Sequence, residues 1–79
     1  MSKDELIERL IELAAKRFKA PKEELEGSSD FFDALAIDSF QAMELMTDVE
    51  EAFDVEVPDY ELQGVRTFEA LAVVLESRV

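Results

Sequence analysis

The chain contains no cysteine and no histidine, and each absence excludes a class of chemistry. Without cysteine the protein can form neither disulfides nor thiolate metal sites, so the hydrophobic core must supply its stability. Without histidine it lacks the side chain that most often serves as a general base near neutral pH. The lack of cysteine also favours a reducing compartment.

Basic residues are scarce as well: 8 lysines and arginines stand against 20 aspartates and glutamates, for a formal net charge of −12. Lys22 and Arg66 enclose 43 residues without a single basic side chain, and this middle segment holds 14 acids. It should repel nucleic acid and anionic membranes. An acidic run commonly serves only to keep a protein soluble. Here the complete lack of basic residues in the segment favours a docking surface for basic proteins.

Long apolar runs are missing too. No run approaches 18 residues, so we expect no membrane span. The first ten residues carry acids and lack the apolar region of a signal peptide, which argues against secretion and favours the cytoplasm. The length predicts one small domain, residues 1–79, that is monomeric, and 48 % hydrophobic residues can provide its core.

Apolar residues at helical spacings predict an all-α fold. Ser2 and Glu5 form a capping box for a first helix, which Ala20-Pro21 ends. The long connection 19–38 carries its own apolar residues, so we expect it to be pinned to the core, with a backbone kink at its glycine and a turn of helix after its Ser-Ser-Asp sequence.

The remainder predicts two further long helices and one short one. A helix is expected from about Ser39 to Phe53, a short helical turn over 59–63 with Gly64 as its left-handed cap, and a last helix after Thr67. The predicted fold is a small four-helix bundle, with three longer helices, one short helix and a long first loop.

The helix 39–53 has two faces when it is drawn at about 100° per residue. Its buried stripe is formed by Ala42, Leu45, Met46, Val49, Ala52 and Phe53. The opposite, solvent-facing side is formed by Glu44, Thr47, Asp48 and Glu51, with Glu50 at its edge. Phe40 and Met43 lie off the apolar stripe, and apolar residues within an acidic surface suit a partner's contact patch.

Ser39 stands where this helix begins. A catalytic serine needs a base, but histidine is absent, the four lysines all lie within residues 3–22, and no G-x-S-x-G elbow surrounds Ser39. The simplest interpretation is a helix cap. Asp38 competes for that role, and if it caps, the Ser39 hydroxyl is exposed where a phosphate ester would lie beside free amides. No metal site is expected, because 59–64 lacks the spaced acids of a calcium loop.

Residues 30–59, DFFDALAIDSFQAMELMTDVEEAFDVEVPD, resemble the core of the acyl carrier protein family. That family has a D-S-L motif, then an acidic helix, then an F-D-[IV]-x-[IV]-P segment. Here the motif reads Asp38-Ser39-Phe40, the acids lie within 44–51, and the proline segment is 53–58. The family's threonine-capped last helix matches Thr67 onward.

The resemblance implies a non-catalytic carrier. A phosphopantetheinyl transferase would attach phosphopantetheine from coenzyme A to Ser39, beside Asp38, and the arm would carry acyl groups as thioesters to fatty-acid, polyketide or related biosynthetic enzymes. Docking on the basic patches of those enzymes would involve Phe40, Met43, Glu44, Thr47, Asp48, Glu50 and Glu51. An acyl pocket would be lined by Leu45, Met46, Val57, Leu62, Val65 and Leu71.

Three positions depart from the family pattern. Phe40 replaces the usual leucine, Gln41 takes a position that is often acidic, and Ala36 stands where glycine is frequent. Because D-S-F also occurs in D-alanyl carrier proteins, a D-alanyl or aminoacyl carrier loaded by an adenylating ligase is an alternative. An acidic interaction module without a prosthetic group, in which Ser39 only caps, is another.

Overall fold

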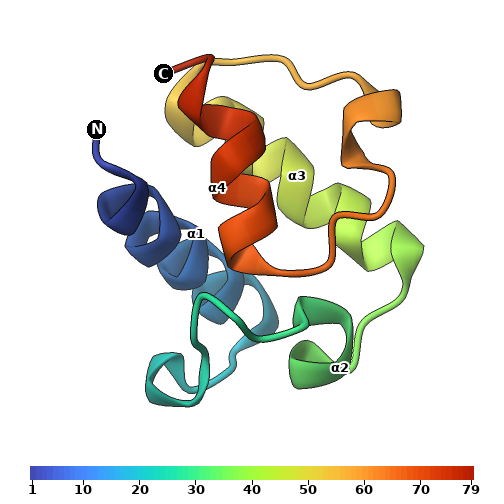
Figure 1. Ribbon diagram of the computed structural model, residues 1–79. Coiled ribbons are helices and arrows are strands. Elements are labelled where there is room, and N and C mark those ends of the chain that lie inside the picture. The colour runs from blue at the N-terminus through green and yellow to red at the C-terminus, as the bar shows by residue number, and fades with distance from the viewer.

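The computed structural model describes residues 1–79 and is built from helices (Figure 1). The helices are α1 (Lys3–Phe18), α2 (Phe31–Leu35), α3 (Ser39–Phe53) and α4 (Phe68–Glu76), with 3₁₀ turns at Lys22–Glu24 and Asp59–Leu62. There is no strand, only one isolated bridge between Asp30 and Thr67. The predicted all-α bundle of three longer helices and a short one is confirmed. No helix has both the length and the apolarity to cross a bilayer.

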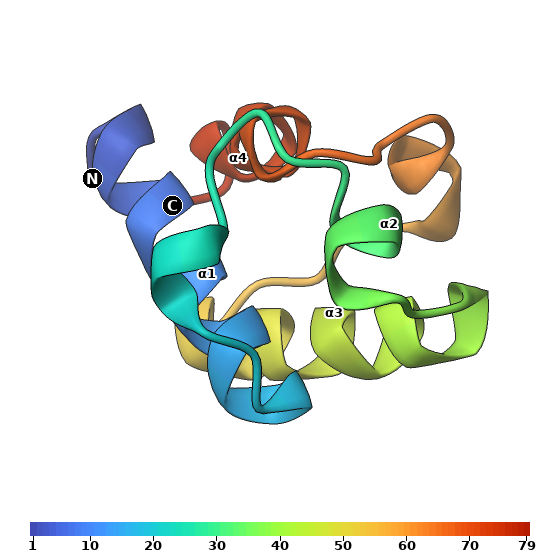
Figure 2. The same ribbon diagram turned by 90° about the horizontal axis from the view of Figure 1, so that it is seen from below.

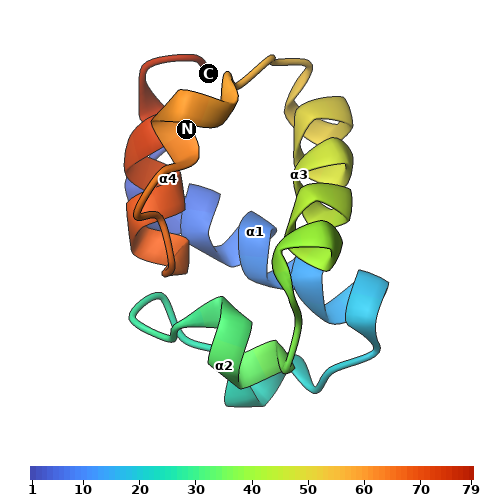
Figure 3. The same ribbon diagram turned by 90° about the vertical axis from the view of Figure 1, so that its right-hand side faces the viewer.

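α1 is the helix that joins the others, because it packs against both α3 and α4. Viewed from its right-hand side, the molecule shows α3 and α4 facing one another with α1 behind them (Figure 3). The turn Asp59–Leu62 spans one end of this arrangement and α2 closes the other. The view from below shows the long first connection arching from the end of α1 past α4 to α2 (Figure 2).

The core is wholly apolar: all 14 buried residues are hydrophobic, and no buried polar side chain is present. Phe68 at the start of α4 is fully buried, and its ring centroid lies 5.6 Å from that of Phe31 on α2. Two backbone bonds pin the first connection, from Phe31 N–H to Arg66 O and from Glu69 N–H to Gly27 O, both at 2.9 Å. The long loop is therefore anchored to the core, as its apolar residues predict.

Side-chain caps set most of the helix starts. The predicted capping box of Ser2 and Glu5 is present, and Thr67 accepts a hydrogen bond from Ala70 N–H. α1 ends at Phe18, two residues before the predicted Ala20-Pro21 stop, because Lys19 turns left-handed with φ 53°. Such a left-handed residue ends a helix whatever follows it.

Both glycines lie in turns, as predicted, but for different reasons. Gly27 has no left-handed backbone conformation. Instead, a Cβ there would lie 3.0 Å from Glu69 Cγ and 3.3 Å from Ile7 Cγ2, so glycine permits close packing on α1 and α4. Gly64 is left-handed, with φ 78°, but it follows the residue that ends the 59–62 turn, which is Gln63 in an extended conformation.

Ala36 ends α2 in the left-handed region, with φ 53° and ψ 46°. Its N–H donates to the carbonyls of Asp33 and Phe32, so the backbone is held there by the turn itself. The Cβ of an L-residue is strained in this conformation, whereas glycine adopts it freely. Position 36, two residues before Asp38, is thus a glycine site that is filled by alanine.

Ala36→Gly should stabilise the protein by about 0.5–1 kcal/mol, because removal of the strained Cβ outweighs the added freedom of the unfolded chain. For a domain of this size that corresponds to a rise in Tm of about 2–8 °C, measurable by thermal unfolding. Ala34→Gly, within α2 in the ordinary helical conformation, is the control and should lower the stability. A Tm of Ala36→Gly at or below that of the wild type would contradict the strain.

Candidate functional site

Ser39 is the first residue of α3 and is exposed to solvent. Asp38, not Ser39, caps the helix: its carboxylate accepts a hydrogen bond from Gln41 N–H at 2.9 Å. The Gln41 side chain accepts one in return from Asp38 N–H at 3.2 Å, which completes a capping box. The interpretation in which Asp38 caps the helix and leaves the Ser39 hydroxyl free is therefore the one that the structure adopts.

The surroundings of the Ser39 hydroxyl fit a phosphate ester. The hydroxyl takes part in none of the side-chain hydrogen bonds, and the backbone N–H groups of Ser39 and Phe40 have no acceptor within the protein. Unpaired N–H groups at a helix start carry the positive end of the helix dipole and favour an anion. A phosphodiester on Ser39 would thus find donors that nothing else in the protein uses. No cluster of acidic side chains is arranged to hold a metal ion.

Two apolar side chains flank Ser39 on the surface of α3. Phe40 is 70 % exposed and Met43 is 61 % exposed, so neither bends into the core. Thr47, one turn further along, is also exposed, and its hydroxyl donates back to Met43 O at 3.2 Å. The surface beside the serine is consequently apolar, and the acids begin at Glu44.

The acids of α3 are less free than their sequence positions suggest. Arg17 of α1 donates two hydrogen bonds to Asp48, one from Nε to Oδ2 and one from Nη2 to Oδ1 at 2.9 Å. Its Nη1 also lies 3.8 Å from Glu44 Oε2. The hydrogen bond from Arg17 lowers the pKa of Asp48, and the same bond raises the pKa of Arg17.

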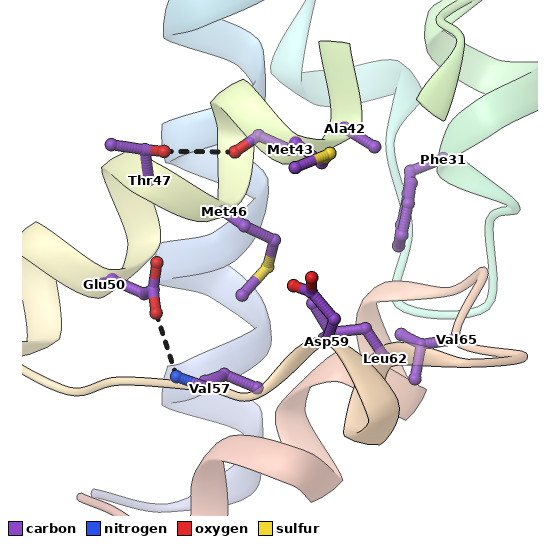
Figure 4. A pocket seen from close by; sticks show the side chains of 10 residues that line it. All are labelled: Phe31, Ala42, Met43, Met46, Thr47, Glu50, Val57, Asp59, Leu62 and Val65. Carbon is purple, nitrogen blue, oxygen red and sulfur yellow. Dashed lines mark hydrogen bonds between the residues drawn. The ribbon is translucent and has the colours of Figure 1, made fainter. Parts of the chain in front are cut away.

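Glu50 has a second internal role. Its Oε2 accepts a hydrogen bond from Val57 N–H at 2.9 Å, which ties the segment after α3 back to the helix (Figure 4). Glu51, by contrast, is exposed and has neither an ion pair nor a hydrogen bond. Sequence analysis missed the roles of Arg17 and Val57, because partners 31 and 7 residues away leave no local signal.

A cavity of about 210 Å³ lies between α3 and the segment 57–65 (Figure 4). It is lined mostly by apolar side chains: Phe31, Ala42, Met43, Met46, Thr47, Glu50, Val57, Asp59, Leu62 and Val65. An apolar cavity of about 150 Å³ is large enough to bind benzene. This cavity can therefore hold a short apolar group.

The structure brings four of the six predicted pocket residues to this cavity: Met46, Val57, Leu62 and Val65. Leu45 and Leu71 do not line it and are core residues, 2 % and 1 % exposed. Ala42, Met46 and Glu50 recur every fourth residue and share one face of α3. Leu45 precedes Met46 by one residue and is rotated from it by about 100°, which turns it into the core.

The residues that line the cavity but were not predicted differ in whether the sequence contains a pattern that could have identified them. Ala42 shares a face with Met46, so helical periodicity could have found it. Phe31 was expected to be a core residue, and its position at the cavity depends on how α2 packs. Asp59 lies at the 59–62 turn, and nothing in its local sequence indicates proximity to α3.

Comparison with known proteins agrees with this geometry. A family model described as a phosphopantetheine attachment site matches residues 8–75. An acyl carrier protein of Prochlorococcus marinus is 31 % identical over 67 residues, which cover 85 % of this chain and 84 % of that protein. An acyl carrier protein of Rubrobacter xylanophilus is 32 % identical over 69 residues, covering 87 % and 85 %. The chain belongs to the acyl carrier protein family, whose members bear covalently attached phosphopantetheine.

The Arg17–Asp48 pair makes a pH-dependent contribution to stability. Since the folded-state pKa of Asp48 is lowered, this contribution is fully present above the ordinary aspartate pKa of about 3.9 and is lost as the pH falls through the folded-state value. Asp48→Asn should therefore be less stable than the control Glu56→Gln at pH 7, by up to about 1 kcal/mol.

Urea unfolding of both variants at pH 7 and at pH 3 checks this expectation. Glu56 is exposed and its carboxylate is unpaired, so Glu56→Gln removes the same negative charge without breaking an ion pair. The difference between the two variants should shrink at pH 3, because Asp48 of the unfolded chain, with its ordinary pKa of about 3.9, is then largely protonated, so less of the contribution remains. A difference that stays constant with pH would show that the Arg17–Asp48 pair does not stabilise the fold.

Proposed function

We propose that Ser39 is the attachment residue for phosphopantetheine and that this protein presents acyl groups to biosynthetic enzymes. The observation that carries the assignment is the capping box: Asp38 and Gln41 satisfy each other, which leaves the Ser39 hydroxyl exposed and unbonded. The attached group, when present, supplies a thiol that holds acyl groups as thioesters. The chain has no cysteine, so it offers no competing thiol of its own.

The residues around Ser39 position the attachment point rather than catalyse. The amides of Ser39 and Phe40 are oriented by α3 and can hold the phosphodiester as hydrogen-bond donors. No histidine is present to activate the hydroxyl, so the proton must be removed by another enzyme. The partner implied is a phosphopantetheinyl transferase, which brings coenzyme A and the catalytic groups.

Partner enzymes would meet the surface of α3. Phe40 and Met43 offer exposed apolar contacts next to Ser39, and Thr47 continues this strip. The acids Glu44, Asp48, Glu50 and Glu51 give the helix a negative field. Such a field steers a basic patch toward the serine and is screened by salt, which suits contacts that must form and break repeatedly.

The cavity is the proposed shelter for the acyl group. Its lining is largely apolar, and Met43 at its edge lies four residues after Ser39, about 6 Å along the helix axis. An acyl chain would reach it from the serine side of α3 and bury apolar surface there. Met46, Val57 and Leu62 belong to the apolar part of its lining, and Glu50 and Asp59 are among its polar side chains.

An aminoacyl cargo is the second candidate, and the exposed Phe40 after Ser39 favours it, because D-S-F occurs in D-alanyl carrier proteins. The apolar cavity favours a fatty acyl group, since a D-alanyl group carries a charged amine that an apolar lining would desolvate. Intact mass of the protein from its native cells distinguishes the two cargoes.

Incubation with coenzyme A and a broad-specificity phosphopantetheinyl transferase should increase the protein's mass by one phosphopantetheine group. Ser39→Ala should abolish the increase completely, because it removes the only hydroxyl at the start of α3. Ser28→Ala, at an exposed serine of the first connection, is the control and should be modified like the wild type. A mass increase that persists in Ser39→Ala, or none in the wild type, would contradict the assignment.

A larger side chain in the cavity should prevent the acyl chain from being buried there. With an octanoyl group on the arm, the Tm of the wild type should rise relative to the unacylated form, because the chain buries apolar surface. In Ala42→Leu, which projects a larger side chain into the cavity, this rise should be largely lost. Ala52→Leu is the matched control and should keep the rise, because Ala52, which helical periodicity wrongly predicts in the buried stripe, is exposed on the same helix. Equal rises in both variants would place the chain elsewhere.

A further inference from the structure

Arg17 is the basic residue that reaches the acids of α3. It lies in the last turn of α1, yet its guanidinium crosses to α3 and contacts two acids one turn apart. Asp48 receives two of its N–H groups, and Glu44 lies 3.8 Å from a third nitrogen. Asp48 is therefore hydrogen-bonded within the chain before any partner arrives, and Glu44 lies within ion-pair distance of the same guanidinium.

The two hydrogen bonds from Arg17 indicate that the Asp48 carboxylate is placed to bind a guanidinium. A guanidinium that donates two N–H groups to one carboxylate forms the arrangement by which proteins most specifically recognise arginine. A partner's arginine that approached Asp48 would need the same two oxygens. Only one guanidinium at a time can bind both oxygens in this bidentate geometry, so a partner's arginine that seeks it competes with Arg17.

The other two acids of α3, Glu50 and Glu51, differ in whether they have a partner within the chain. Glu50 is bonded to Val57 N–H, and only Glu51 of the four acids has no internal partner. The intramolecular contacts thus divide the negative face into a free part at Glu51 and an occupied part at Glu44 and Asp48. A partner that uses the occupied part must first displace Arg17.

From this competition we infer that Arg17 is an internal competitor of partner arginines and limits how tightly basic enzymes dock on α3. The inference rests on the proposed carrier function, in which α3 is the docking surface. The occupant expected at Asp48 and Glu44 is an arginine in the basic patch of a partner enzyme. Because Arg17 is tethered next to these acids, it re-forms its contacts as soon as the partner's arginine leaves, which favours rapid release.

Replacing Arg17 should therefore strengthen docking. The probe is the rate of Ser39 modification by a phosphopantetheinyl transferase with coenzyme A, measured as kcat/KM for the carrier at low and high salt. Arg17→Met should raise kcat/KM about fivefold at low ionic strength, with a smaller gain at high salt. Arg17→Lys keeps the charge but loses the fork of donors, so it should fall between the wild type and Arg17→Met.

The control is Lys22→Met, which makes the same change in net charge. Lys22 also lies near two acids, Glu8 at 4.0 Å and Glu12 at 3.8 Å, but both are on α1. If only the net charge matters, Lys22→Met and Arg17→Met will raise kcat/KM equally, and the inference is overturned. It is supported if Arg17→Met alone gives the increase while both variants retain a cooperative thermal transition.

Asp48→Asn in two backgrounds tests the competition directly. In the Arg17→Met background the substitution removes a carboxylate that is free to bind, whereas in the wild type it removes one that is already occupied. The fold-loss in kcat/KM should therefore be larger in the Arg17→Met background. Equal losses in both backgrounds would show that Arg17 does not shield Asp48.

The outcomes separate this inference from the proposed function. If the wild type is modified at Ser39 and Arg17→Met is no faster, the carrier function stands and the competitor role of Arg17 is wrong. If no variant gains mass, the assignment of Ser39 fails, and the inference that depends on it fails too.

Discussion

The reciprocal hydrogen bonds between Asp38 and Gln41 are the contact on which the proposed role of Ser39 depends. They fix the first residue of α3 and satisfy the helix start without using Ser39. A serine in the capping role would turn its hydroxyl back onto the backbone, where a modifying enzyme would have to break the cap to reach it. Here the cap is Asp38 and the proposed attachment residue is its neighbour Ser39, so a modification at Ser39 would leave the cap intact.

The acidic face of α3 is partly neutralised by the protein's own Arg17. A net charge of −12 attracts basic surfaces from a distance, and under the proposed docking on α3 a partner that bound Asp48 would have to displace Arg17. Long-range attraction and short-range affinity are thereby separated. A carrier that visits several enzymes benefits from this separation, because fast encounter does not then imply slow release.

Much of the fold could be predicted from the sequence. The bounds of α3 were predicted correctly, because an apolar stripe with a period near 3.6 coincides with the Asp-Ser start. The capping box of α1 and the threonine cap of α4 could also be predicted, since a cap involves residues that are close together in the sequence. The roles of Gly27 and Arg17 were not, because each depends on which helices meet in space.

The site, too, could be predicted from the sequence only where the signal is local. Ser39 could be singled out from its neighbours alone, and the cavity residues Met46, Val57, Leu62 and Val65 from a family resemblance. Leu45 and Leu71 were placed in the pocket because their apolar character alone does not tell a cavity wall from a core. For Leu45 a rotation of about 100° along α3 makes that difference. Leu71 lies on α4, which contributes no residue to the cavity, and only the packed structure shows this.

The position of α1 has a consequence for the volume of the cavity. Because α1 contacts both α3 and α4, the wall formed by 57–65 is not needed to hold those helices together. The connection that leads into that wall is held to α3 by two hydrogen bonds to Glu50, one from Val55 N–H to its backbone oxygen and one from Val57 N–H to its carboxylate. A longer guest would therefore widen the cavity at the expense of the Glu50 bonds and the burial of Val57, while the contacts of α1 still hold α3 and α4 together.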